Sequence, residues 1–205
     1  RWLERNVRRH QLAGYTSVTL SLKPHGSAAP GDVTREQMLA VADLADRFSF
    51  GEIRATQGQN LVLADVAQAD LYALWQAAHP IGLATSNIGL LTDMIACPGG
   101  DYCALANTRS IPVAQAIQQR FADLDALHDF GAISLNVSGC MNSCSHHHLG
   151  NIGVLGIDKN GEEWYQIVLG GEHGNTTAIG KVIGPSFRAT EIPEIIAKIL
   201  EIYRA

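Results

Sequence analysis

The chain has 205 residues, of which 46% are hydrophobic and 17% are charged. This composition excludes an intrinsically disordered chain and allows one compact domain, or two small ones, with a real core. The formal net charge of −5 argues against a general nucleic-acid binder, and the lack of eighteen uninterrupted apolar residues argues against a membrane-spanning helix.

The first eighty residues predict a small α+β unit. Thr34 and Gln37 form a capping-box signature in front of an amphipathic segment, which predicts the start of a helix. In chain order we expect a linker or helix end (1–14), a strand (15–23), this helix as far as Gly51, two strands (52–56 and 60–66) and a helix that stops before Pro80. We assign residues 15–80 to one domain and residues 81–205 to a second.

The second region is richer in glycine. Ser110 is the expected cap of a helix, and an isoleucine-rich stripe from Ile192 to Leu200 predicts a closing helix. Between them we expect three strands, at 133–137, 150–157 and 164–169. Glycines repeat at positions 150, 153 and 156, but they lie within a predicted strand and do not form a dinucleotide fingerprint. We interpret them as backbone room beside a flat cofactor or as tight hairpins.

Four cysteines occur as two close pairs. Cys97 and Cys103 form a C-x5-C pair, and Cys140 and Cys144 form a C-x3-C pair. A secreted domain held by disulfides would be shorter and richer in cysteine, so we interpret the pairs as metal ligands. Long spacers and the glycines at 99, 100 and 139 favour a cubane iron–sulfur cluster over a single zinc ion, while zinc stays open. Unrelated core cysteines are the least favoured interpretation, because both pairs lie in predicted loops.

Three separated motifs resemble the sirohaem and [4Fe–4S] signature of the nitrite/sulfite reductase family. They are the stretches 54–61, 97–103 and 135–153, and they follow the family's order over essentially the whole chain. The resemblance implies an α+β fold with a ferredoxin-like half-unit followed by a sirohaem/[4Fe–4S]-domain α+β unit. It also implies that this chain corresponds to the C-terminal half of a protein built from two similar halves, which fits a sequence that opens at Arg1.

The resemblance further implies the ligands of the cluster. In the family all four cysteines bind the cluster, and the last one also touches the sirohaem iron. The implied ligands are therefore Cys97, Cys103, Cys140 and Cys144, and Cys144 is the implied catalytic bridge. We expect the four sulfur atoms to converge on one site.

The same resemblance implies residues that contact sirohaem, namely Arg54, Thr56, Gln59, Asn60, Arg109 and Asn142. Each has an ordinary alternative: Asn142 as a turn residue, Arg54 as an exposed strand arginine and Arg109 as half of a surface salt bridge. Residues His146, His147 and His148 suggest metal binding by composition. Relatives often carry an arginine at position 146, so we favour a structural role for the three histidines.

We predict from these features the haemoprotein of a sulfite reductase, which reduces sulfite to sulfide with six electrons. Nitrite reduction to ammonia is the alternative within the family, and a stand-alone iron–sulfur electron carrier or a structural zinc module are alternatives outside it. The expected partners are the missing N-terminal half, a small inorganic anion and a separate electron donor, either a flavoprotein subunit or a ferredoxin. We expect a cytoplasmic protein with no nucleic-acid or membrane partner.

Overall fold

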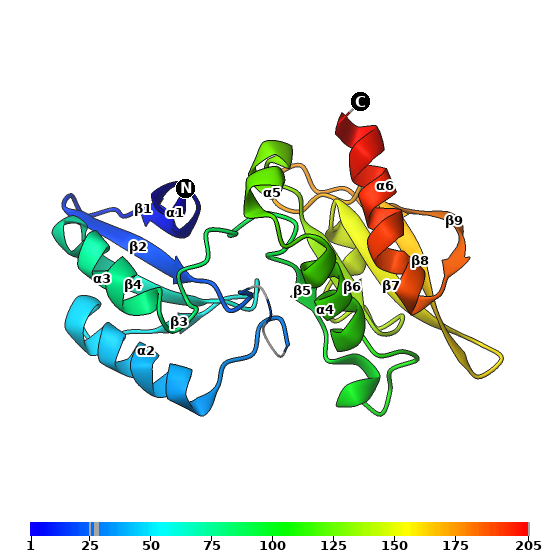
Figure 1. Ribbon diagram of the computed structural model, residues 1–205, viewed down its shortest axis with the longest axis horizontal. Helices are drawn as coiled ribbons and strands as arrows, with labels where there is room; N and C mark the ends of the chain where they lie inside the picture. The colour runs from blue at the N-terminus through cyan, green and yellow to red at the C-terminus, as the bar shows by residue number, and fades with distance from the viewer. Residues whose placement is uncertain (25, 27–28, 205) are drawn as a thin grey trace. The chain divides into compact units, whose positions relative to one another are not determined.

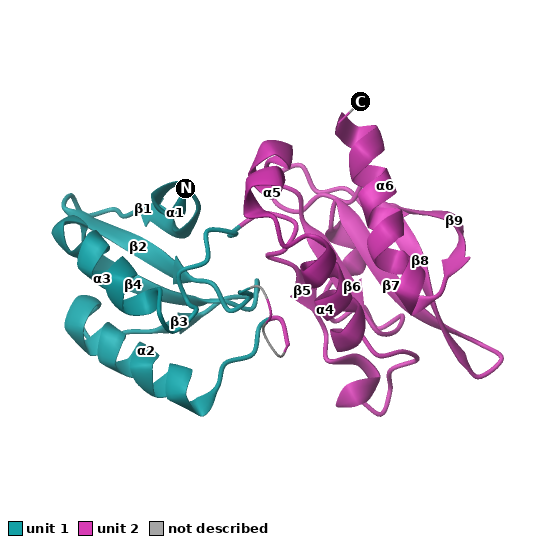
Figure 2. Ribbon diagram, in the orientation of Figure 1, with its two compact units in different colours: residues 1–24, 31–88 teal, residues 25–30, 89–205 magenta. Residues whose placement is uncertain are grey.

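The computed structural model describes residues 1–24, 26 and 29–204. The chain forms two compact units, unit 1 with residues 1–24 and 31–88 and unit 2 with residues 25–30 and 89–205 (Figures 1 and 2). Each unit has its own hydrophobic core, so each is stabilised by burial within itself.

Unit 1 is built on a four-stranded antiparallel sheet with the strand order β1-β2-β4-β3. Its strands are β1 (Val7–Arg9), β2 (Tyr15–Leu20), β3 (Arg54–Ala55) and β4 (Leu61–Ala67). Its helices are α1 (Trp2–Asn6), α2 (Arg35–Phe48), the 3-10 turn η1 (Gln68–Asp70) and α3 (Leu71–Ala78). Alternate residues of β2, Val18 and Leu20, are fully buried in one core with Leu44 of α2 and Leu74 of α3. The two long helices therefore cover one face of this sheet.

The capping box predicted for α2 is present in full. The side-chain oxygen of Thr34 accepts from the backbone of Gln37 at 3.1 Å, and Gln37 Oε1 accepts from the backbone of Thr34 at 3.0 Å. Residues 7–9, in contrast, belong to the sheet as β1 and are not a linker. This strand is short, and Arg8 and Arg9 are exposed, so it carries no apolar alternation that could predict it.

Unit 2 contains a mixed five-stranded sheet with the order β5-β6-β7-β8-β9. The strands are β5 (Ile95–Ala96), β6 (Leu135–Ser138), β7 (Ile152–Lys159), β8 (Glu162–Leu169) and β9 (Lys181–Phe187). β5, β6 and β7 are parallel, whereas β7, β8 and β9 are antiparallel. The helices are η2 (Gly99–Asp101), α4 (Ile111–Arg120), α5 (Leu124–Phe130), η3 (His147–Leu149), η4 (Ala189–Glu191) and α6 (Ile192–Arg204).

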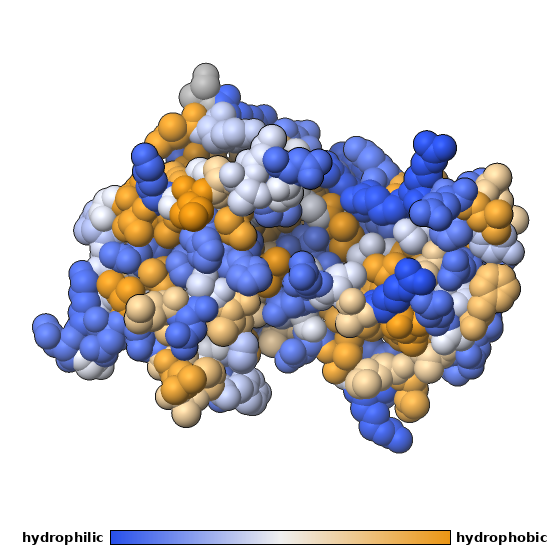
Figure 3. Space-filling view, turned by 180° about the vertical axis from the view of Figure 1, so that it is seen from behind, coloured by the Kyte–Doolittle hydropathy of each residue, from blue (hydrophilic) through white to orange (hydrophobic). Residues whose placement is uncertain are grey.

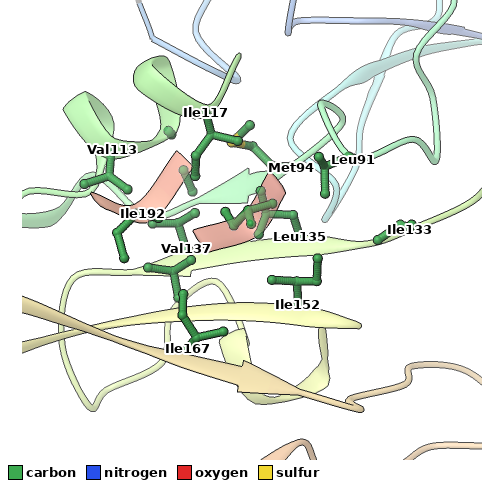
Figure 4. Packing of buried hydrophobic residues seen from close by; sticks show 14 of the residues in the cluster. Leu91, Met94, Val113, Ile117, Ile133, Leu135, Val137, Ile152, Ile167 and Ile192 are labelled. Atoms are coloured by element: carbon green, nitrogen blue, oxygen red, sulfur yellow. The ribbon is translucent and has the colours of Figure 1, made fainter. Parts of the chain in front are cut away.

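The core of unit 2 lies between the helices and the sheet (Figure 4). Ile117 of α4 and Ile192 of α6 are fully buried with Val137 of β6 and Ile167 of β8. Helices α4 and α6 also pack on one another, and Arg120 pairs with Glu194 at 2.6 Å between them. This packing fixes α4, and with it the segment that precedes its first turn.

The surface has the mixed character expected of a folded domain. Figure 3 shows hydrophobic side chains in small groups among hydrophilic ones on the face that it presents. Within the described part of the chain, no helix is long and apolar enough to cross a membrane.

Candidate metal centre

The candidate site of unit 2 lies where two parallel strands end. β5 and β6 are neighbours with Ile95 paired to Asn136 and Ala96 paired to Val137. Cys97 follows β5 directly, and Cys140 follows β6 after a single glycine. Because the carboxyl ends of parallel strands meet at one edge of a sheet, the topology brings both cysteine pairs to the same edge.

The first cysteine loop turns tightly after Cys97. The backbone N–H of Cys97 still donates to Val137 O at 3.0 Å, and Cys103 N–H returns to Gly99 O at 2.9 Å. Gly99 has a φ of +59°, and a Cβ placed on it would lie 2.4 Å from Ser110 N. Position 99 therefore requires glycine, both for its left-handed backbone and for its close neighbour.

The second cysteine loop is a succession of tight turns. Ser143 N–H donates to Cys140 O at 3.2 Å, and His146 N–H donates to Ser143 O at 2.7 Å. Ser143 and His146 both have left-handed backbones, with φ values of +56° and +53°. Non-glycine residues adopt this region rarely, so the surrounding contacts must hold the loop in this shape.

The two cysteine loops touch one another through their backbones. Gly139 N–H donates to Cys97 Sγ at 3.1 Å, and a Cβ on Gly139 would lie 2.9 Å from Gly99 Cα. Only glycine permits so close an approach of the two chains. The distance between the loops is therefore set by backbone contact.

A short segment before α4, residues 107–110, joins both loops; we call it the crossbeam. Asn107 N–H and Thr108 N–H each donate to Gly139 O at 3.0 Å, and Gly100 N–H donates to Thr108 O at 2.8 Å. Tyr165 of β8 is fully buried, and its hydroxyl donates to Arg109 O at 2.8 Å. Burial raises the pKa of Tyr165 to about 12, so its hydroxyl stays a donor at neutral pH.

The four cysteines are free thiols that differ in exposure. Cys140 is buried, Cys97 and Cys103 are half-buried, and Cys144 is exposed. Sulfur at Cys144 is therefore open to a group bound outside the two loops, whereas Cys140 faces the protein interior.

The donor set fits an iron–sulfur cluster. Four unbridged thiols stand on two loops that touch, and no disulfide consumes them. Among the described residues, no three His, Cys, Asp or Glu side chains are grouped closely enough for a single metal ion. In a cubane cluster each of the four irons binds its own thiolate, so the four sulfur atoms lie farther apart than the ligands of a single metal ion.

Three large hydrophobic side chains near the cysteines in sequence are exposed. Tyr102, Leu105 and Met141 are 81%, 74% and 83% exposed, although each is a large hydrophobic side chain beside the cysteines. Large exposed hydrophobic side chains beside candidate ligands fit a binding surface. Such side chains fit the ring of a macrocycle such as sirohaem, whereas its carboxylates need polar or cationic partners.

Asn142 and Arg109, two predicted sirohaem contacts, differ in their surroundings. The Asn142 side chain is exposed and has no hydrogen-bond partner within the described residues. Arg109 is 58% exposed and donates through both its backbone N–H and Nε to Glu163 Oε1 at 3.3 Å. The amide of Asn142 is thus available, whereas Arg109 forms the surface salt bridge that was its ordinary alternative.

The predicted contacts in unit 1 lie on β3 and the loop behind it. Arg54 is exposed, and its Nε donates to Glu52 Oε1 at 2.5 Å, which raises the pKa of Arg54. The Thr56 hydroxyl lies within the same loop, where it donates to Asn60 O at 3.2 Å and accepts from Asn60 N–H at 3.1 Å. Gln59 is half-buried with a φ of +54°. Local contacts therefore occupy Arg54 and Thr56.

Asn60 and the neighbouring Lys23 hold this loop from inside. Asn60 is buried, and its Oδ1 accepts from Leu22 N–H at 3.0 Å. Lys23 is 1% exposed, and its Nζ donates to Gly58 O. Asn60 therefore supports its own loop and does not present its amide to solvent, and Lys23 is a buried cation that sequence reasoning missed. Its long-range contact with Gly58 reveals it.

The three histidines do not coordinate around a common point. Ser143 Oγ lies 3.1 Å from His147 Nδ1 and 2.9 Å from His148 Nδ1, so it connects both rings. A hydroxyl has one proton, so at least one of the two imidazoles carries its own proton on Nδ1. Burial lowers the pKa of His147 to about 4, with His148 as a smaller cause, so His147 is neutral at pH 7. These rings support the turns of the second loop.

Both units match family models of known proteins. Residues 10–81 match the nitrite/sulfite reductase ferredoxin-like half domain, and residues 90–205 match the nitrite and sulphite reductase 4Fe-4S domain. The chain belongs to the nitrite and sulfite reductase family. The predicted α+β fold with a ferredoxin-like half-unit is thereby confirmed, and so is the prediction of a family of oxidoreductases that use a [4Fe–4S] cluster and sirohaem.

Relatives of this family member include reductases of both anions. It is 29% identical to the ferredoxin–nitrite reductase of Synechococcus elongatus over 83% of this chain and 34% of that protein. It is 31% identical to sulfite reductase [ferredoxin] 2 of Mycolicibacterium paratuberculosis over 74% of this chain and 29% of that protein. The solved structure of the NirA protein of Mycobacterium tuberculosis matches 96% of this chain and 36% of its own with a TM-score of 0.75 and 26% identity.

The relatives differ in length. The chain spans about a third of the curated reductases named above. It covers 76% of the assimilatory-type sulfite reductase of Nitratidesulfovibrio vulgaris, at 26% identity over 85% of this chain. The family therefore contains long members and at least one short member.

The glycines of β7 have a role other than the room beside a cofactor that their repeat suggests. A Cβ on Gly153 would lie 2.0 Å from His147 O, and one on Gly156 would lie 1.8 Å from Thr108 Oγ1. The chain itself fills the space above both glycines, so they allow η3 and the crossbeam to pack on β7. Sequence reasoning missed Thr108 and Glu163: Thr108 lies in a polar run in front of α4, and Glu163 lies at the start of β8.

Proposed function

We propose that the four cysteines hold one [4Fe–4S] cluster and that the Cys144 sulfur also contacts the sirohaem iron. The observation that carries this proposal is the contact of the two cysteine loops at the carboxyl edge of β5 and β6, with Cys144 left exposed. When bound, this pair of cofactors would pass electrons from a donor to the substrate and provide the iron that binds the anion.

The residues of the chain would then divide the work. The crossbeam holds the two loops at a fixed separation, so the thiols are positioned before the cluster binds. Tyr102, Leu105 and Met141 exclude water from one side of the macrocycle, and the free amide of Asn142 donates to its edge. Polar and apolar groups therefore support the same ligand.

Arginine side chains of the chain would pair with the carboxylates of sirohaem. Arg54 and Arg109 are the predicted contacts, and each already pairs with a glutamate, Glu52 and Glu163 respectively. Both pairs are exposed, and exposed ion pairs contribute little to stability, so exchange of a glutamate for a cofactor carboxylate costs little. The arginine pairs are therefore compatible with the predicted role.

We propose sulfite as the substrate, with nitrite as the alternative. Sulfite takes up six electrons and six protons to give sulfide and three waters. Relatives named as sulfite reductases occur among both the long and the short proteins that match this chain. The nitrite alternative rests on relatives named as nitrite reductases. Steady-state assays with each anion on one preparation decide between them by the ratio of kcat/KM.

We further propose that the anion-binding cage includes residues outside these 205 and that a separate protein delivers the electrons. The chain spans about a third of its long relatives, and the cations predicted to face the cofactors are few and paired. A donor of the ferredoxin kind is favoured by the names of two relatives, with a flavoprotein subunit as the alternative. The alternative is that a short chain carries the whole anion-binding cage itself, since one relative of similar length is named as a sulfite reductase.

The test is to load residues 1–205 anaerobically with iron, sulfide and sirohaem and to record absorption before assaying sulfite reduction with reduced methyl viologen. We expect Soret and red bands of sirohaem together with cluster absorption, and turnover far below that of a long relative. Zinc without visible absorption would contradict the metal assignment, and a brown cluster spectrum without sirohaem bands would favour an electron carrier. Turnover equal to that of a long relative would contradict the proposal of an external cage.

A further inference from the structure

We propose that Ser110 is a positioning residue that raises the reduction potential of the cluster by donating a hydrogen bond to the Cys97 sulfur. This inference rests on the proposed function, because it requires a cluster on Cys97. Ser110 is fully buried, and its Oγ lies 3.4 Å from Cys97 Sγ. Neither family-level resemblance nor sequence spacing assigns it this role, since from the sequence it is the cap of a helix.

The Ser110 hydroxyl does not cap the helix it precedes. Serine at this position ordinarily accepts from a backbone N–H of the first turn, and losing such a cap costs about 1 kcal/mol. Here Ser110 stands at the N-cap of α4 with an α-helical backbone, φ −92° and ψ −35°, and its side chain makes no capping bond. Among the described residues, its Oγ has no hydrogen-bond partner other than Cys97. The Ser110 hydroxyl therefore contacts the Cys97 sulfur instead of making a capping hydrogen bond.

The direction of this hydrogen bond follows from the state of the ligand. A free thiol and a hydroxyl can each donate to the other, but a cysteine that ligates iron is a thiolate and has no proton. Ser110 must then donate and Cys97 must accept. Gly139 N–H donates to the same sulfur at 3.1 Å, so Cys97 receives two donors.

Cys97 is distinguished from the other three cysteines by these bonds. Within the described residues, the sulfur atoms of Cys103, Cys140 and Cys144 accept no comparable hydrogen bond. The Cys97 sulfur lies 3.4 Å from the side chain of the N-cap residue of α4, a helix of 10 residues whose N-terminus favours negative charge. The donors and the dipole therefore act together on one of the four ligands.

The effect on potential follows from the charge of the cluster. On reduction, one electron passes from the reductant to the cluster, no proton moves, and the charge of the cluster with its four thiolates changes from −2 to −3. A hydrogen bond to a more negative sulfur is stronger, so the Ser110 O–H stabilises the reduced form more than the oxidised form. Removing the hydroxyl should make the cluster harder to reduce.

The test is an EPR-monitored redox titration of the holoprotein, isolated anaerobically and reduced with dithionite through mediators. The variants are Ser110→Ala, Ser110→Thr and Ser110→Val, because threonine keeps the hydroxyl and valine has the same shape without it. Ser134→Ala is the matched control, since Ser134 bonds to Asn151 in the same unit and has no sulfur contact.

We expect Ser110→Ala and Ser110→Val to lower the ratio of reduced to oxidised cluster at a given potential about tenfold, a midpoint about 59 mV more negative for one electron. Ser110→Thr and Ser134→Ala should match the unsubstituted protein. If the alanine variant loses its cluster, the threonine and valine pair decides, and equal midpoints in that pair overturn the inference. Folded variants that all fail to hold iron would also overturn it, because Ser110 would then act in cluster retention. A missing cluster signal in the unsubstituted holoprotein would instead contradict the proposed function.

Discussion

The loop at residues 54–60 in unit 1 and the cysteine edge of unit 2 are both predicted to contact sirohaem, yet they are built in opposite ways. In the unit 1 loop the polar side chains bind the chain itself, as Arg54 does to Glu52 and Asn60 to Leu22. At the cysteine edge the backbone is held by hydrogen bonds, while Cys144 and Asn142 stay exposed. A prosthetic group needs a preorganised backbone and ligand side chains that are not already bound to the chain itself. We therefore expect the main cofactor determinants to lie in unit 2.

The largest effect that we expect is the loss of the cluster when a cysteine ligand is removed. Cys140→Ala removes a buried thiol from the second loop, and we expect nearly all cluster absorption and acid-labile sulfide to be lost. Met141→Leu is the control, because it changes an exposed neighbour in the same loop without removing a thiol. Full retention of iron and sulfide in Cys140→Ala would remove this cysteine from the site.

The close packing of the crossbeam on β7 predicts the next effect. A Cβ in Gly156→Ala would lie 1.8 Å from Thr108 Oγ1, so we expect a loss of about 1–3 kcal/mol of unfolding free energy in urea. Adding Thr108→Ala should recover part of that loss, because it removes the opposing oxygen. Gly58→Ala in unit 1 is the control, since its new Cβ would meet nothing closer than 3.7 Å. Additive losses in the double variant would contradict the contact.

Two asparagines with the same predicted role sharpen the comparison directly. Asn60→Ala leaves Leu22 N–H without its acceptor inside unit 1 and should cost about 1–3 kcal/mol of stability while leaving the sirohaem Soret band unchanged. Asn142→Ala should change stability by less than about 0.5 kcal/mol but shift that band. Urea unfolding and absorption of each holoprotein measure both quantities. The reverse pattern would move the cofactor contact to the unit 1 loop.

The smallest expected effect concerns pH. The folded-state pKa of His147, about 4, lies below the ordinary value of 6.5, so the unfolded chain binds more protons between these values. Stability from this residue is full above pH 6.5 and is lost as the pH falls toward 4. Urea unfolding at pH 7 and pH 5 should show a smaller decrease for His147→Gln than for the parent. The exposed His146→Gln is the control, and equal decreases in parent and His147→Gln would contradict the assignment.

Sequence patterns predicted the elements with strong local signals. The capping box located α2, and the apolar stripe located α6, because these signals depend on neighbours within one or two turns. Strands β1, β5 and β9 and helix α5 were missed, since β1 and β5 are only three and two residues long and most of β9 is exposed. Short or exposed segments have no periodicity to detect.

The sequence predicts candidate ligands for the site but not the contacts that support the two loops. The spacing of the cysteines identifies the two loops, whereas the link from Thr108 to Gly139 spans 31 residues and depends on the folded topology. Ser110 was predicted as a helix cap, and its hydroxyl instead lies beside Cys97. Contacts of this kind follow from the strand order of the sheet, which local patterns do not specify.

The proposed centre is one four-iron cluster that the two cysteine loops hold and that Cys144 joins to sirohaem. Mössbauer spectroscopy of the oxidised, iron-57-enriched holoprotein at liquid-helium temperature tests it most directly. A [4Fe–4S] cluster in its oxidised state is diamagnetic, so a sulfur shared with the paramagnetic sirohaem iron should split the signals of about four cluster irons magnetically. An unsplit cluster doublet beside an independent haem signal, or no cluster component at all, would contradict the claim.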